Sequence, residues 1–258
     1  MAVIPRIPQD IIDEISDLLA ADSDFQSLQS CALLSKSWVQ PCRRHLFRVV
    51  LFTRKDAVRW FDAFPVPEQS PAHHIRDLRV RIGGVDCVPE RFFEWIPWFM
   101  DVTRLSLLGH GFGSSLRPSL WRLPQSITSL TIDTSVFTLV QVWNIMAQLP
   151  NLDDLSLSGS RTPGALPEIR PPLRGRFRGR LLLSGGYSGK GFMGKLAETP
   201  SGLCFTDVET SSTRSSFLSA VRLAEACGKT LVKLSQTIYL FGKPHPFSQS
   251  SRFWCMEP

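Results

Sequence analysis

The chain has 258 residues, of which 43% are hydrophobic and 20% are charged, and this composition excludes wholesale disorder. It contains no apolar run long enough for a membrane span, and its first residues lack the basic start and apolar core of a secretory signal. The formal net charge is +6, but five arginines and no acids lie between Arg170 and Arg180, so the basic character is local and does not mark the whole chain as a nucleic-acid-binding protein.

The first 48 residues predict three short helices. The first opens at Pro8, whose missing N–H suits a first helical turn, and its apolar residues recur at helical spacing: Ile11, Ile12, Ile15, Leu18 and Leu19. Ser23 or Asp24 can cap a second helix, and Ser35 can cap a third, which carries Trp38. A unit this small normally needs a staple, a metal or a partner to complete its burial. No disulfide framework or metal cluster is present in this stretch, so we expect a protein partner.

These residues resemble the F-box. The resemblance rests on Ile7-Pro8 where the family usually has Leu-Pro, on the isoleucine-rich first helix, on LQSCALLSKSW from Leu28 to Trp38, and on the closing RRHLF. It implies docking on the Skp-type adaptor of a cullin-based ubiquitin ligase through Ile7, Pro8, Ile11, Ile12, Ile15, Leu28, Leu33 and Trp38. The alternative is that these are core residues folding back on the rest of the chain. Pro41, inside the third helix, leaves its length open.

After this unit the chain repeats itself. Copies of one pattern begin at Ile75, Val102, Ile127 and Leu152, spaced by 27, 25 and 25 residues, with apolar residues at positions 1, 4 and 6. Positions 4 and 6 of a strand point to the same side, so each copy presents its apolar side chains to its neighbours in a stack. The spacing falls within the period of about 20 to 29 residues that leucine-rich repeats have.

Helices are predicted between these strands, and further strands at both ends. The helical segments are residues 56–64, 90–100, 138–150 and 216–231, and residues 48–52 form the first strand. Looser copies surround Leu181, Leu203 and Leu231. We therefore predict seven or eight βα units.

This portion resembles the leucine-rich-repeat-like domains that follow the F-box in many fungal proteins. The predicted fold class is α+β or α/β: a three-helix F-box at residues 1–48, then an irregular βα solenoid at residues 49–258. Irregularity is expected because the standard Asn or Cys at position 9 is replaced by Gly83, His110, Ser135 and Ser160. Phe253 and Trp254 stand where a solenoid needs a polar cap, so the chain is expected either to stop short of a full domain or to bind something there.

No assembled catalytic or metal-binding pattern is present. Six cysteines are scattered without a C-x-x-C pair, which fits neither a zinc site nor a disulfide scaffold and favours the cytosol or nucleus. No histidine, serine or cysteine has the local signature of an activated nucleophile. We predict no enzymatic activity, no cofactor and no metal.

The arginine-rich run is a candidate partner patch. It contains Arg174, Arg176, Arg178 and Arg180, which alternate with glycines and Phe177. This alternation predicts either a strand with one arginine-lined face, which the family resemblance favours, or a flexible arm that tracks phosphates. An ordinary exposed face or a patch for an acidic protein partner is the first expectation, and RNA is the alternative.

The sequence therefore predicts a substrate-receptor subunit of a Skp/cullin/F-box-type ubiquitin ligase. The first helices would bind the adaptor and the repeats would bind a target protein. The alternatives are a freestanding repeat scaffold whose N-terminal helices only cap the solenoid, and an RNA-associated protein that uses Arg174 to Arg180. No membrane association is expected.

Overall fold

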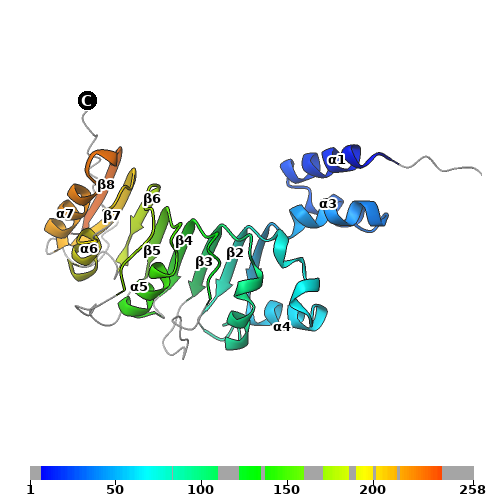
Figure 1. The fold of residues 1–258 in the computed structure, drawn as a ribbon, viewed down its shortest axis with the longest axis horizontal. Helices are drawn as coiled ribbons and strands as arrows, with labels where there is room; N and C mark the ends of the chain where they lie inside the picture. Colours follow the sequence, from blue (N-terminus) through cyan, green and yellow to red (C-terminus); the bar gives the residue numbers. More distant parts are fainter. Residues whose placement is uncertain are drawn as a thin grey trace, which may run out of the picture.

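The computed structural model describes residues 7–82, 84–109, 122–134, 137–159, 171–185, 190–199, 202–213 and 216–239. Three helices come first, and a region of alternating strands and helices follows, built on one parallel sheet (Figure 1). The prediction of a mixed helix-and-strand fold with a parallel sheet is confirmed. The position-9 residues Gly83, His110, Ser135 and Ser160, and the aromatic tail with Phe253 and Trp254, lie outside the described residues.

The first three helices are α1 (Gln9–Ala21), α2 (Phe25–Cys31) and α3 (Lys36–Leu46). Pro8 takes the N-cap position of α1 and does not enter its first turn. The carboxylate of Asp24 caps α2 by accepting the backbone N–H of Ser27 at 3.0 Å. Ser35 precedes α3, but its hydroxyl makes no capping bond and lies 2.7 Å from the hydroxyl of Ser37.

Pro41 does not end α3, which continues to Leu46. Proline has no N–H, so the carbonyl of Ser37, four residues earlier, loses its helical hydrogen bond. The side-chain Nε2 of Gln9 donates to that carbonyl at 3.4 Å. A residue of α1 therefore supplies the bond that Pro41 cannot, and this answers the question of length that the sequence left open.

The described residues form one sheet of eight parallel strands, in sequence order from β1 to β8. The strands are β1 (Val49–Phe52), β2 (Asp77–Arg81), β3 (Arg104–Gly109), β4 (Ser129–Thr134), β5 (Asp154–Ser158), β6 (Arg180–Leu183), β7 (Asp207–Thr213) and β8 (Lys233–Tyr239). The apolar position 4 of each copy is in register with its neighbours, as in Leu78, Leu105 and Leu130. The predicted alternation thus places one row of apolar side chains inside the molecule.

Helical segments connect the strands. They are α4 (Arg54–Ala63), η1 (Pro67–Gln69), η2 (Pro71–His74), η3 (Glu90–Glu94), η4 (Ile96–Trp98), α5 (Leu139–Ala147), α6 (Lys190–Ala197), α7 (Phe217–Cys227) and η8 (Gly228–Thr230). The α-helix predicted for residues 90–100 is wrong: this stretch forms the two short 3-10 turns η3 and η4. Pro97 lacks the N–H that an α-helix would need there. None of the described helices is long and apolar enough to cross a membrane.

In the part of the chain that the structure describes, buried apolar residues form two hydrophobic clusters that share no buried residue. The larger one lies between the inward face of the sheet and the connecting helices. The smaller one consists of Ile12, Leu28, Trp38 and Cys42, within the first three helices. Phe47 belongs to the sheet side, because its ring packs edge-on against Trp60 with centroids 6.0 Å apart. The three helices project from the β1 end of the sheet (Figure 1).

Before β6 the chain contains one extra residue. In the earlier copies the inward residue stands three positions before the first strand leucine, whereas Phe177 stands four positions before Leu181. The backbone of Phe177 adopts φ 49° and its buried ring packs against Phe205 with centroids 5.4 Å apart. Gly179 completes the turn, since a Cβ there would clash with Oδ1 of Asp154. A left-handed residue and a glycine together absorb the insertion.

Thr210 interrupts the inward row of apolar residues. It is in register with Leu183, is 2% exposed, and its hydroxyl has no hydrogen-bond partner. Burying an unpaired hydroxyl costs roughly 1–3 kcal/mol, so we expect Thr210→Val to raise the free energy of unfolding by about 1 kcal/mol. Denaturant unfolding of the two proteins measures this difference in free energy. Thr206→Val is the control, because the exposed Thr206 hydroxyl donates to the Gly179 carbonyl and its loss should not stabilise. A destabilised Thr210→Val protein would contradict the expectation.

Candidate functional site

The helices α1 and α3 lie side by side and run in the same direction. Gln9, at the start of α1, bonds to the carbonyl of Ser37, at the start of α3. Further along, Oδ1 of Asp17 on α1 lies 2.8 Å from Nη2 of Arg44 and 2.7 Å from Nε2 of His45 on α3. The hydrogen bond from His45 is the main cause that lowers the pKa of Asp17, with the positive charge of Arg44 adding to it. Both helices therefore begin at the same end of the unit.

Exposed aliphatic side chains gather at that end. Ile7 and Ile11 lie within two residues of Gln9, and Leu33 and Leu34 lie in the turn that leads into α3. Their exposed fractions are 52%, 41%, 88% and 68%. We call Ile7, Ile11, Leu33 and Leu34 the apolar end. Pro8, between the two isoleucines, is also exposed.

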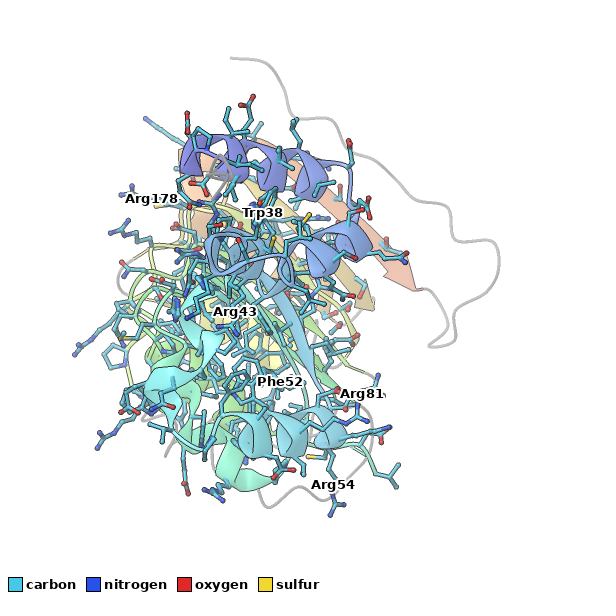
Figure 2. The ribbon with its side chains drawn as sticks, turned by 90° about the vertical axis from the view of Figure 1, so that its right-hand side faces the viewer. Trp38, Arg43, Phe52, Arg54, Arg81 and Arg178 are labelled. Atoms are coloured by element: carbon cyan, nitrogen blue, oxygen red, sulfur yellow. The ribbon has the colours of Figure 1, made fainter. Side chains whose placement is uncertain are left out.

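The predicted adaptor-contact residues therefore divide into two groups. Ile7, Pro8, Ile11 and Leu33 are open to solvent and available to a partner. Ile12, Leu28 and Trp38 are 1%, 0% and 7% exposed, and Ile15 is partly buried against them. These buried residues pack against one another and hold the three helices together, with the Trp38 side chain reaching from α3 toward α1 (Figure 2). Leu34 was missed by the sequence prediction, because only its position after the end of α2 exposes it.

The arginine run is neither a free arm nor a strand over most of its length. Only Arg180 belongs to a strand, β6. The N–H of Phe177 donates to the Leu152 carbonyl at 2.8 Å, and the Phe177 carbonyl accepts from the N–H of Cys204 at 3.1 Å. The segment is thereby held between its neighbours. The arginines are exposed and Phe177 is buried. Arg178 lies at the periphery of the molecule (Figure 2).

Arg180 serves the sheet itself. Its guanidinium lies 2.6 Å from Glu209 and 3.9 Å from Asp207, and its backbone N–H donates to Oδ1 of Asp154 at 2.7 Å. Lys233 approaches the same Asp207 at 3.8 Å. Among the described residues, Arg174, Arg176 and Arg178 have no ion pair. The candidate partner patch is therefore reduced from four open arginines to three.

A hollow of about 630 Å³ lies where α3 and η2 meet the starts of β1, β2 and β3. We call it the junction pocket. Its lining includes Arg44 and Arg48 from the end of α3 and beyond, and His73 and His74 from η2. Nε2 of His74 donates to Oε1 of Gln40 on α3 at 3.1 Å. No sequence pattern indicates this pocket, because its two halves come from separate segments that only the packing of α3 on η2 brings together.

Three of the described cysteines, Cys42, Cys87 and Cys227, are suited to packing and not to nucleophilic chemistry. Burial raises the pKa of the Cys227 thiol to about 11, and burial also raises the pKa of Cys42 and of Cys87. These thiols stay protonated near neutral pH, and the thiolate is the nucleophile. Within the described ranges, no group of three or more His, Cys, Asp or Glu side chains is placed to hold a metal ion.

Comparison of the chain with protein-family models, with curated proteins and with solved structures found no match. The surfaces that can indicate a function are therefore the apolar end, the arginine run and the junction pocket.

Proposed function

We propose that the chain is a substrate-receptor subunit of a Skp/cullin/F-box-type ubiquitin ligase. Residues 1–48 would act as the F-box and bind a Skp-type adaptor. Residues 49–258 would act as a leucine-rich-repeat-like solenoid that binds a target protein. The observation that carries the proposal is the apolar end: exposed aliphatic residues on a helical unit that has its own core and projects from the sheet.

The apolar end favours a protein partner with a complementary apolar surface. Fully burying one Ile or Leu side chain is worth roughly 1.5–3 kcal/mol, and Ile7, Ile11, Leu33 and Leu34 leave much of that free energy unused in the free chain. The residues that already pack within the unit, such as Trp38, preorganise the two parallel helices for docking. The exposed residues also coincide with motif positions of the F-box resemblance, namely Ile7-Pro8 and Leu33.

The sheet supports a role in binding a target. Ser106, Thr131 and Ser156 occupy aligned outward positions on neighbouring strands, so the middle of this face carries small polar side chains. Such a face offers a continuous surface along which a protein segment can lie. The proposed mechanism is scaffolding in the cytosol or nucleus: holding a target lysine near an enzyme bound elsewhere raises their effective concentration. In this proposal no residue of the chain performs bond chemistry.

Binding to a Skp-type adaptor tests the proposal. We expect wild-type chain to co-purify with the adaptor, and Ile11→Asp combined with Leu33→Asp to weaken binding by at least about 30-fold, or ~2 kcal/mol, because charges would replace two anchors. Both positions are exposed, so the helices should stay folded, which circular dichroism checks. Leu218→Asp on α7, where Leu218 is 72% exposed, is the matched control and should bind normally. Equal binding of wild type and the double variant would refute the assignment.

A further inference from the structure

The junction pocket has more positive than negative charge in its lining. Four arginines and two aspartates line it, a formal surplus of two positive charges before any imidazole is protonated. Asp77 already accepts two hydrogen bonds from Arg79, from Nε at 3.2 Å and from Nη2 at 2.9 Å. Asp101 lies 3.2 Å from Arg76. Both carboxylates of the lining are therefore already paired with a guanidinium, one from within the lining (Arg76) and one from outside it (Arg79).

Two of the lining arginines have no anionic partner among the described residues. Arg48 follows α3 and Arg104 opens β3, and both are exposed. Each guanidinium presents several N–H donors in one plane, a geometry that suits the oxygens of a carboxylate or a phosphate. They are the groups in this pocket that are free to bind an anion.

Burial and the positive charges around the pocket both affect the pKa of His74. Burial is the main cause that lowers its pKa, and the charges of His73, Arg43, Arg44 and Arg76 lower it further. The His73 and His74 rings lie 3.9 Å apart between centroids. The lowered pKa favours the neutral form of His74 at pH 7, and a bound anion would raise this pKa by offsetting the surrounding positive charge. This imidazole supplies a local readout of anion binding.

The junction pocket continues onto the outward face of the sheet. Arg104 also lines two further hollows, of about 270 and 370 Å³, the second of which reaches Arg180 on β6. A ligand that lies along these three hollows crosses from β1 to β6, and each strand adds roughly 4.8 Å to its path. The path is therefore longer than a small anion. A chain molecule with one strongly negative group fits this shape.

We propose that the junction pocket binds a phosphate monoester carried on an extended protein segment, which continues past Arg104 over the outward face of the sheet. A phosphate monoester carries roughly −1.5 to −2 charges near neutral pH, which matches the formal surplus in the lining. A single carboxylate would neutralise only half of it. That this segment belongs to a ligase target rests on the proposed function, whereas the phosphate chemistry does not.

The test uses the full chain without an adaptor. Two fluorescent pools of degenerate peptides, identical except for a central serine or phosphoserine, are compared by anisotropy, with phenyl phosphate as a competitor. We expect the phosphorylated pool to bind at least tenfold more tightly, and the His74 resonances to titrate at higher pH when it is bound. Arg48→Gln with Arg104→Gln should remove most of this preference. Arg174→Gln with Arg178→Gln removes the same charge from the exposed arginine run and should leave binding within about twofold.

Three results would overturn the proposal. Equal binding of the two pools would show that the pocket does not recognise the phosphate. If the Arg174→Gln, Arg178→Gln control loses binding and the Arg48→Gln, Arg104→Gln variant does not, the phosphate binds at the arginine run and not in the junction pocket. If phenyl phosphate competes at the same concentration as the peptide, the peptide chain adds nothing to binding. The ligand would then be a small phosphorylated molecule and not an extended protein segment. Failure here is distinguishable from failure of the ligase assignment, because Arg48→Gln with Arg104→Gln should bind the adaptor as wild type does.

Discussion

Replacing Trp38 with alanine is expected to unfold the three N-terminal helices while the sheet stays folded. Trp38 is 7% exposed and is the largest member of the cluster that it forms with Ile12, Leu28 and Cys42. Truncating a buried tryptophan costs about 3–5 kcal/mol. A unit with so small a core has little stability to lose, so the helices should be largely unfolded at room temperature. The sheet should be unaffected, because its buried residues contact each other and not this cluster.

Backbone amide NMR measures this result residue by residue. The amides of α1 to α3 should lose their dispersion and protection from exchange, while those of β2 to β7 keep theirs. Trp98→Ala is the control, because Trp98 lies in η4 on the sheet side and is 38% exposed. It should leave the helical signals in place. Retained protection in α1 in the Trp38→Ala protein would show that the cluster does not hold the helices together.

The sheet could be predicted because its signal is local and repeated. Each strand from β2 to β5 carries apolar residues two positions apart, preceded by another three positions before the first, and the period places the copies beside each other. Leu105, Leu130 and Leu155 came into register as the pattern required. Alternation over a few residues needs no long-range information, and so the sequence alone contains it.

The stretch before β6 could not be predicted in the same way. The alternating arginines match a strand pattern. The repeat period would place the inward residue three positions before Leu181, at Arg178, but the inward residue is Phe177, one position earlier. The chain accommodates the extra residue through the left-handed backbone of Phe177 and through Gly179 against Asp154. That solution depends on the neighbouring strand β5, which a local pattern does not describe. The 3-10 turns at residues 90–98 are a similar case, set by Pro97.

The candidate binding surfaces were predicted only in part. Spacing marks Ile11 and Ile12 equally as apolar, but the two side chains diverge by about 100° around the helix. Only Ile12 faces α3, at 1% exposure, and Ile11 is left at 41%. The junction pocket had no sequence signal at all, since Arg48 and His74 are far apart in sequence and neither stands in a motif. Tertiary contacts decide which of these residues pack inward and which stay exposed and available to a partner.

Replacing Phe52 with alanine is expected to give the opposite result to Trp38→Ala: loss of the sheet's first strands with retention of the three helices. Phe52 is 1% exposed, and its ring lies 4.8 Å from Phe92, 5.2 Å from Trp60 and 6.1 Å from Phe99, between centroids. It lies in the interior of the sheet region (Figure 2). Truncating a buried phenylalanine costs about 3–5 kcal/mol, and here it also removes three aromatic contacts.

Denaturant unfolding followed by NMR checks this prediction. The amides of β1, β2 and η3 should lose protection at lower denaturant than in wild type, and those of α1 should not change. Leu51→Ala is the matched control, because Leu51 is the preceding residue of β1 and is 43% exposed on the outward face. Its effect should stay below about 1 kcal/mol. A Phe52→Ala sheet as stable as that of Leu51→Ala would contradict the importance of the aromatic cluster.

The two core variants together separate a docking unit from a cap. A cap shares its core with what it covers, so either substitution would unfold both parts. A docking unit keeps its own core, so each substitution would unfold one part. The described contacts between the parts are few: α3 meets η2, His74 bonds to Gln40, and Phe47 packs on Trp60 from the sheet side. None of them joins the two hydrophobic clusters, so we expect each substitution to unfold only its own part, as the proposed docking role of the helices requires.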